Sequence, residues 1–145
     1  MEARVRRSFA RQAYMAAIGA ELVHVAAGEV DIALAFSDRL TQQDGYLHAG
    51  VVAGVTDSAC GYAALTTMEA GAEVLTVEFK INLLAPAGGE RLIARGRVLR
   101  TGRTLTVCRG EAVTVSGSQE KHVATLTATL IAIVRSRPTP ERPGA

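Results

Sequence analysis

The sequence predicts an α+β fold in which one long central helix packs against an antiparallel sheet. A run over residues 49–68 contains a single charged side chain, Asp57, and is rich in alanine, glycine, serine and threonine. Four segments with the composition of strands follow this run, and short stretches that contain glycine separate them. Because such stretches favour tight reversals between antiparallel neighbours, we interpret the four segments as strands of one sheet.

The length of 145 residues suits one domain, which we expect over residues 1–134, with an N-terminal helix. Three prolines in residues 135–145 predict a disordered C-terminal tail. With 48% apolar and 21% charged residues, the composition is that of a globular chain. No secretory signal pattern is present, and Cys60 and Cys108 stand in apolar surroundings, so we expect a cytoplasmic protein with reduced, buried thiols.

The distribution of charge argues against nucleic acid and membrane as partners. The formal net charge is +2, but residues 12–134 hold nine basic and twelve acidic side chains, and the basic excess lies near the ends. A nucleic-acid-binding domain normally concentrates basic residues with aromatic ones on one face. The uncharged run is built from small residues rather than large aliphatic ones, so we expect a helix buried against a sheet and not a membrane span.

The elements follow one another along the chain as helix, strand, long helix and four further strands. Residues 2–17 are loosely amphipathic and predict the N-terminal helix, and residues 29–36 alternate apolar and polar side chains with the period of a half-buried strand. After the long helix we interpret the remaining strands as a four-strand meander. These strands are expected at residues 74–84, 91–100, 105–115 and 122–134.

The long helix places its one carboxylate on a stripe of glycines. With 3.6 residues per turn, Gly50, Gly54, Asp57 and Gly61 fall on one face. Glycine inside a helix costs about 1 kcal/mol relative to alanine, so we expect a ligand or another backbone to approach this face closely. Partial desolvation would raise the pKa of Asp57 and favour a role as base or nucleophile; the alternative is a carboxylate that is hydrogen-bonded for structural reasons.

His48 stands at the start of the same helix, nine residues before Asp57. On a regular helix this spacing corresponds to about 13.5 Å of rise, so one chain does not easily bring both side chains to one bond. A two-fold dimer would solve this, because one subunit would supply His48 and its partner Asp57. The alternative for His48 is a helix cap or structural donor.

Two segments carry a resemblance to a known family. They are Gln42-Gln43-Asp44-Gly45-Tyr46-Leu47-His48-Ala49-Gly50, which precedes Asp57-Ser58-Ala59-Cys60-Gly61, and the later segment from Thr76 to Ala87 with its Ala85-Pro86 pair. With them the chain resembles the hotdog-fold acyl-CoA thioesterases of the phenylacetate-pathway, PaaI-like type, which include thioesterase superfamily member 2. The spacing of the family pattern is kept, although Gln42, Ala49 and Thr76 replace the usual asparagine, glycine and serine.

The resemblance implies a hotdog fold, in which a curved antiparallel sheet of five to six strands wraps a long central helix. It implies an acyl-CoA thioesterase that works as a homodimer, or as a tetramer built from two dimers, with inter-subunit active sites and no cofactor. Asp57 would activate water or attack the thioester directly, and Thr76 would orient that water. The Gln42 amide and the Ala49 N–H would hold the developing oxyanion.

The resemblance also implies that His48 assists near the departing thiolate. Glycines of the motif and the helix, Gly45, Gly50 and Gly54, would let the substrate approach the backbone. On residues 91–100, the arginines at 91, 95 and 97 share a strand face and could meet the phosphates of coenzyme A, as could Arg103 in the turn. Solvated surface charges are the alternative for these arginines.

Other readings of the sequence are less favoured. No histidine or cysteine pair has the spacing of zinc ligands, and no G-x-S-x-G elbow is present. A hotdog hydratase would need a different arrangement of Asp and His. An acyl-CoA or lipid-binding module without chemistry stays open as an alternative, although a binder of a neutral acyl group gains little from a desolvated carboxylate. The acyl group and the choice between dimer and tetramer are not readable.

Overall fold

The computed structural model of the protein describes residues 1–134 and has one sheet of six antiparallel strands. The helices are α1 (Glu2–Phe9), α2 (Ala13–Ile18) and α3 (Ala49–Thr67), with a 3-10 turn, η1, at Asp38–Leu40. The strands are β1 (Ala20–Ala26), β2 (Glu29–Ala35), β3 (Ala72–Leu83), β4 (Arg91–Thr101), β5 (Leu105–Ser116) and β6 (Gln119–Val134). The expected C-terminal tail, residues 135–145, lies outside the described residues.

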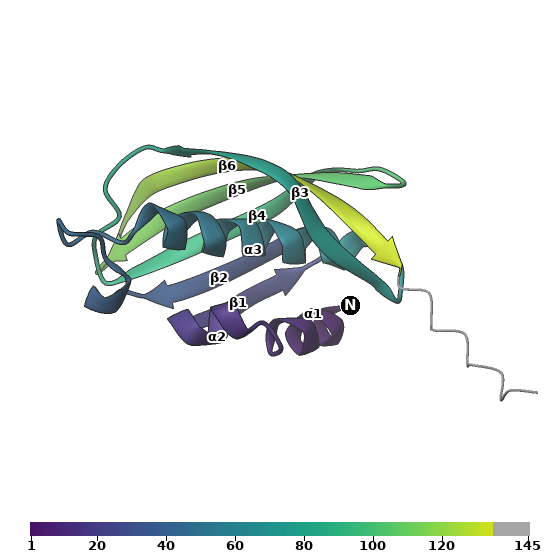
Figure 1. The fold of residues 1–145 in the computed structure, drawn as a ribbon, viewed down its shortest axis with the longest axis horizontal. Coiled ribbons are helices and arrows are strands. Elements are labelled where there is room, and N and C mark those ends of the chain that lie inside the picture. The colour runs from purple at the N-terminus through teal and green to yellow at the C-terminus, as the bar shows by residue number, and fades with distance from the viewer. Residues whose placement is uncertain (135–145) are drawn as a thin grey trace, which may run out of the picture.

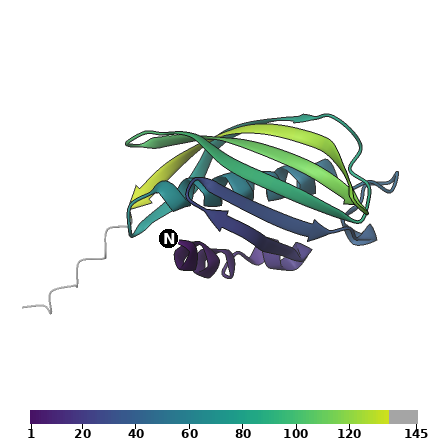
Figure 2. The ribbon, with the colours of Figure 1, turned by 180° about the vertical axis from the view of Figure 1, so that it is seen from behind.

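The sheet curves around α3, which lies along its hollow face (Figure 1). The two short helices α1 and α2 lie beside the β1 edge, and in residues 1–134 no helix covers the outer face of the sheet (Figure 2). The expected hotdog arrangement, a long central helix wrapped by a curved antiparallel sheet, is therefore confirmed. Within residues 1–134, no helix has the length and apolar character needed to cross a membrane.

The strands predicted after the long helix are confirmed, but their arrangement as a four-strand meander is wrong. The sheet order is β1-β2-β4-β5-β6-β3, so β3 pairs with β6 at one edge and β4 pairs with β2. The chain from β3 therefore crosses to the other half of the sheet through residues 84–90. The local turn residues mark where a strand ends, whereas partner choice depends on side chains far apart in sequence that must face α3 together.

The N-terminal part differs from the prediction in two ways. The single helix expected over residues 2–17 is broken, because α1 ends at Phe9 and α2 starts after Gln12, its N-cap. Strand β1 was missed, since a register shift between Leu22 and His24 interrupts its alternation and most of its residues are exposed or half-buried. Edge strands with such irregularities leave a weak pattern in the sequence.

Helix α3 lies unusually close to the sheet because two strand glycines face it. A Cβ atom added at Gly96 would lie 2.6 Å from the backbone nitrogen of Cys60 and against the carbonyl of Ala59. At Gly110 it would lie 2.6 Å from the Thr56 methyl carbon. The side of α3 opposite its glycine stripe is thus held against bare backbone, and Cys60 and Cys108 are free and fully buried there, as expected.

Candidate functional site

Asp57 is half-buried and lies on the side of α3 that meets β3. The Thr76 hydroxyl, on β3, donates a hydrogen bond of 2.9 Å to Oδ1 of Asp57. Burial raises the pKa of the Asp57 carboxyl above its usual range, and the bond from Thr76 lowers it in part. A carboxylate with a raised pKa and one hydroxyl partner suits proton transfer or nucleophilic attack.

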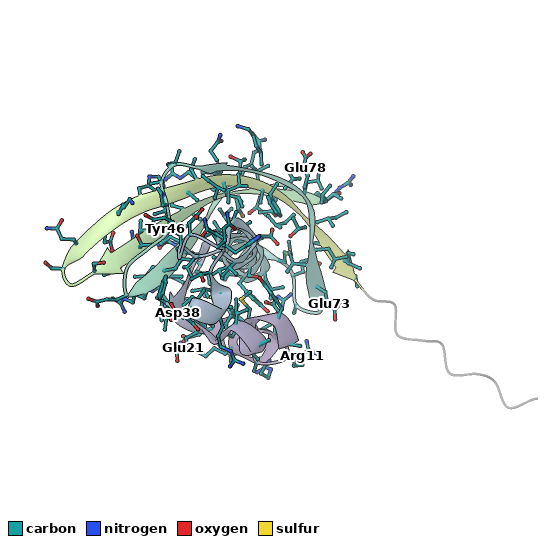
Figure 3. All side chains as sticks on the ribbon, turned by 60° about the vertical axis from the view of Figure 1, so that its left-hand side comes forward. Arg11, Glu21, Asp38, Tyr46, Glu73 and Glu78 are labelled. Atoms are coloured by element: carbon teal, nitrogen blue, oxygen red, sulfur yellow. The ribbon has the colours of Figure 1, made fainter. Side chains whose placement is uncertain are left out.

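A groove of about 1100 Å³ opens over Asp57. Its floor comes from α3 and β3, and its wall from α1 and the turn after it; the N-terminal helices lie below α3 in the view nearly along that helix (Figure 3). In this view Arg11 and Glu73, which both line the groove, lie on the same side of α3. The groove therefore offers a floor of mixed polar and apolar residues, one raised-pKa carboxylate and cationic side chains on its wall.

Gln12 fixes the N-terminal helices beside the carboxylate. Its amide nitrogen donates to the Tyr62 hydroxyl at 3.3 Å, and its amide oxygen accepts from the Ser58 hydroxyl at 3.4 Å. The rings of Phe9 and Tyr62 pack with centroids 5.6 Å apart. These contacts hold the wall of the groove on the turn of α3 that follows Asp57.

The residues expected to hold an oxyanion line a second pocket, of about 540 Å³. Gln42 and Ala49 contact it together with apolar residues of the segment after β3. The amide oxygen of Gln42 accepts from the backbone N–H of Asp44, which fixes the orientation of the amide group. No hydrogen bond to another described residue is found for the Ala49 N–H. Asp57 is absent from this pocket, so residues 1–134 of one chain do not gather the two halves of the predicted site.

His48 is the N-cap of α3 in its own chain. Its Nδ1 accepts a hydrogen bond of 2.8 Å from the backbone N–H of Gly50, as expected for a capping side chain. The imidazole does not contact Asp57 in the same chain, in agreement with the helical spacing. The structure thus shows the capping role, and a catalytic role stays a prediction.

The three glycines predicted to bind substrate have different surroundings. A Cβ at Gly54 would lie 2.9 Å from the Tyr14 ring, so α2 covers this part of the stripe. At Gly50 it would lie 3.1 Å from the His48 imidazole. Gly45 has a positive φ of 83° in an open loop, a conformation that favours glycine. The expected close approach to the stripe is therefore made by Tyr14 at Gly54, whereas the groove lies over Asp57 and Gly61.

The arginines considered for coenzyme A lie away from the groove. Arg95 pairs with Glu120 at 2.6 Å and Arg97 with Asp31 at 2.6 Å. Arg103 is exposed in the β4–β5 turn, which lies at the C-terminal end of α3, where the hydroxyls of Thr101 and Thr67 are 3.2 Å apart. None of these arginines is among the residues that line the two described pockets.

Sequence reasoning did not single out the individual N-terminal residues that line this groove. The lining includes Arg4, Arg7, Arg11, Gln12, Ser58 and Tyr62. The arginine-rich amphipathic pattern of residues 2–17 predicts a helix, but it does not indicate which part of the protein the helix packs against. Among residues 1–134, no three or more histidine, cysteine, aspartate or glutamate side chains gather as metal ligands would.

Comparisons with known proteins agree with this geometry. Residues 44–121 match the family model described as "Thioesterase superfamily". A crystal structure of a thioesterase family protein from Silicibacter pomeroyi is 50% identical, with a TM-score of 0.89, over 90% of this chain and 96% of that one. The PaaI protein of the E. coli phenylacetic acid degradation operon shares the fold, with a TM-score of 0.80 at 20% identity over 88% of this chain and 89% of that one.

A relative in Saccharolobus solfataricus, which carries the name "Putative esterase", is 32% identical over 60% of this chain. The match covers 61% of that relative, so the chain spans about three fifths of its length. The matched region of the family model begins in the loop before α3 and ends on β6. It therefore contains Asp57, Thr76 and the second pocket's Ala49.

Proposed function

Since the chain belongs to the thioesterase superfamily, we propose that it hydrolyses the thioester of a small aryl- or medium-chain acyl-CoA to the free acid and coenzyme A. The observation that carries this proposal is the half-buried Asp57, with its raised pKa and its Thr76 partner, at the floor of a groove lined by both polar and apolar residues. The setting fits a cytoplasmic protein, in which the two buried cysteines stay reduced.

In the proposed reaction the ionised Asp57 takes a proton from a water molecule whose oxygen attacks the thioester carbonyl carbon. Thr76, bonded to the same carboxylate, orients this water. The C–O bond forms, the carbonyl becomes an oxyanion, and its collapse breaks the C–S bond and releases a thiolate that takes up a proton. Direct attack by Asp57 would give an acyl anhydride that a second water hydrolyses; both routes need the ionised carboxylate.

The oxyanion donors come, in this proposal, from a second copy of the chain. Gln42 and Ala49 lie in a separate pocket at the front end of α3, where the N-terminal end of the helix dipole favours negative charge. His48 caps the same turn and would stand near the departing thiolate. Each active site would then take Asp57 and Thr76 from one subunit and the donors from its partner.

The surface that would join the two copies is the free edge of β3. This strand ends the sheet, and its large apolar side chains Leu75, Val77, Phe79 and Leu83 are 43% to 56% exposed. An apolar edge strand of this length is a template for pairing with another chain, and natural proteins normally cover such an edge. A second β3 strand in antiparallel orientation would cover it and extend the sheet.

The register of such a pair would bring the two half-sites together. A two-fold axis between Phe79 and Lys80 would set the partner's Leu83 opposite Thr76. Leu83 lines the same pocket as Gln42 and Ala49, and Thr76 touches Asp57. The symmetric pair would therefore carry two equivalent sites, and two such dimers could associate into a tetramer.

Thiol release from a panel of acyl-CoAs tests the proposed function. We expect turnover by the wild-type protein and a fall in kcat of about 10²- to 10⁴-fold for Asp57→Asn, since this is the range for a lost general base. Asp38→Asn, at the exposed 3-10 turn, is the matched control and should keep full activity. Full turnover by Asp57→Asn would contradict the assignment. Binding of acyl-CoA by the wild type without any turnover would support the non-catalytic acyl-CoA or lipid-binding module instead.

Thermal melting separates loss of chemistry from loss of folding in this test. Burial raises the pKa of Asp57 in the folded protein, so ionisation of this group is less favourable there than in the unfolded chain. The folded state therefore loses stability as the pH rises through the raised pKa. Asparagine carries no charge and can still accept from Thr76. We therefore expect Asp57→Asn to unfold at a temperature no lower than that of the wild type at pH 7.

A further inference from the structure

Two of the four arginines in residues 2–18, Arg7 on α1 and Arg11 in the turn between α1 and α2, are available for a ligand in the Asp57 groove. Arg4 lines the groove but is occupied, because its guanidinium donates to the Met68 carbonyl at 3.1 Å and also to the Ala72 carbonyl. Arg6 pairs with Glu2 at 2.7 Å and does not line the groove. Arg7 and Arg11 line it, are exposed, and have no ion pair with any residue in the range 1–134.

Small and apolar residues form part of the groove floor beside Asp57, together with the polar side chains of Ser58, Glu73 and Thr76. On α3, Gly61 and Leu65 follow Asp57 at i+4 and i+8, which corresponds to about 12 Å along the helix. On the other side of the groove, Val74 precedes Thr76 by two residues and so points to the same face of β3. A Cβ at Gly61 would meet nothing within 4 Å, so this part of the floor is open.

The position of Arg11 relative to this floor is set by the contacts of its neighbour. Gln12 is hydrogen-bonded to both Ser58 and Tyr62. Burial raises the pKa of the Tyr62 phenol, and the positive charge of the nearby Arg11 lowers it in part. Figure 3 shows Arg11 at the side of the groove below α3. The turn that carries Arg11 is thus docked on the turn of α3 next to the carboxylate.

We propose that Arg7 and Arg11 form a subsite on the wall of the Asp57 groove that binds an anionic group of the substrate. This inference rests on the proposed thioesterase function and extends it to a substrate class. A guanidinium group presents several N–H donors in a plane and pairs with carboxylate or phosphate oxygens. The anion is either a carboxylate at the far end of the acyl chain or a phosphate of coenzyme A.

Three thioesters distinguish these sources: a neutral medium-chain acyl-CoA, the same acyl group on N-acetylcysteamine, which lacks phosphate, and its ω-carboxy analogue on N-acetylcysteamine. The test variant is Arg7→Gln with Arg11→Gln, and the matched control is Arg6→Gln on α1. We expect the double variant to raise KM by at least about tenfold for an anionic substrate, since charge-assisted hydrogen bonds are lost. The neutral N-acetylcysteamine ester and the control variant should show no change.

The pattern of effects decides the outcome. A rise in KM confined to the CoA ester supports a phosphate as the anion, and one confined to the ω-carboxy ester supports a carboxylate. The proposal is overturned if all three thioesters keep their KM, or if the neutral ester is affected as strongly as the others.

Failure of the proposed function gives a different result. If the wild-type protein hydrolyses none of the three thioesters, calorimetry with the corresponding thioethers, which cannot be hydrolysed, replaces the kinetic assay. At least about tenfold weaker binding of an anionic thioether by the double variant would then still support the subsite. Equal dissociation constants for wild type and double variant would overturn it independently of catalysis.

Discussion

The protein around Asp57 disfavours the ionised form of its carboxyl, and the hydroxyl of Thr76 partly compensates by donating a hydrogen bond to it. Burial is the larger cause of its raised pKa, and the hydrogen bond from Thr76 acts in the opposite direction. The proposed reaction uses the ionised carboxylate. Activity should therefore fall on acidification at a pH above the usual pKa of aspartate, about 3.9.

Thr76→Val tests how the two residues are coupled. Without the hydroxyl, the hydrogen bond that lowers the pKa of Asp57 is lost, so the acidic limb of the kcat/KM profile should move to higher pH. The plateau should also fall, because the water is less well oriented. The measurement is kcat/KM for one acyl-CoA across pH, with Thr76→Ser as the control that keeps the hydroxyl.

An acidic limb at the same pH in wild type and Thr76→Val would show that Asp57 does not control this limb. A shift in Thr76→Ser equal to that in Thr76→Val would show that the hydroxyl is not the cause.

At the scale of elements, the close contact between α3 and the sheet depends on glycine in the strands rather than on glycine in the helix. The glycines of the helix stripe meet a side chain or open space, whereas Gly96 and Gly110 meet α3 itself. Sequence reasoning expected close approach at the helix stripe. The close approach to α3 backbone occurs on its opposite side, where the strand glycines remove the Cβ layer.

Gly96→Ala should destabilise the protein, because its Cβ would overlap the backbone of α3 and neither element can move freely. Overpacking of this kind costs about 1 to 3 kcal/mol. Gly61→Ala is the contrast: its Cβ points into open space within a helix, so the stability should rise by up to about 1 kcal/mol. Urea unfolding of both variants gives the two free-energy changes.

Equal stability of Gly96→Ala and wild type would show that the contact relaxes without cost. A loss of stability in Gly61→Ala would show that space beside this residue is needed for folding.

At this scale, the sequence predicts features that depend on residues close together in the chain, but not those that depend on residues far apart. The position of β2 followed from its alternation and the ends of β4, β5 and β6 from turn residues, so these were predicted. The order of the strands was not, because the pairing of β3 with β6 joins segments far apart in the chain. Likewise the motif marked Asp57 and Thr76, whereas Gln12 reaches the site only through docking of α2, which no local pattern records.

At the scale of the whole molecule, the two pockets divide the proposed chemistry between opposite parts of one chain. The groove over Asp57 and the pocket with Gln42 and Ala49 share no lining residue. Pairing of two chains along β3 would complete each site, because the groove of one chain would meet the Gln42 and Ala49 pocket of its partner. Association and activity are therefore expected to be lost together.

Phe79→Glu tests this dependence. In both copies the variant removes an apolar ring from the centre of the proposed strand pair and puts a charge there, and charged side chains on an edge strand oppose pairing. We expect a monomer in sedimentation velocity and a fall in kcat of about 10²- to 10³-fold, as for a lost oxyanion donor. Val23→Glu, an exposed apolar position on the β1 edge, is the control and should keep the assembly and activity of the wild type.

A wild-type chain that is monomeric and active, or a monomeric Phe79→Glu variant that keeps full activity, would contradict the shared site. Dissociation by Val23→Glu instead would place the interface at the opposite edge.

Because α3 packs directly on Gly96 and Gly110, its two sides differ in how well they tolerate substitution. On the sheet side, any larger residue must be accommodated by several neighbours at once, so single substitutions there are costly. On the groove side, Gly61 has free space and the hydrogen bond of the Ser58 side chain to Gln12 is long, so single substitutions should be tolerated there. New acyl preferences should therefore be reached in directed evolution by varying that side alone, without first rebuilding the scaffold.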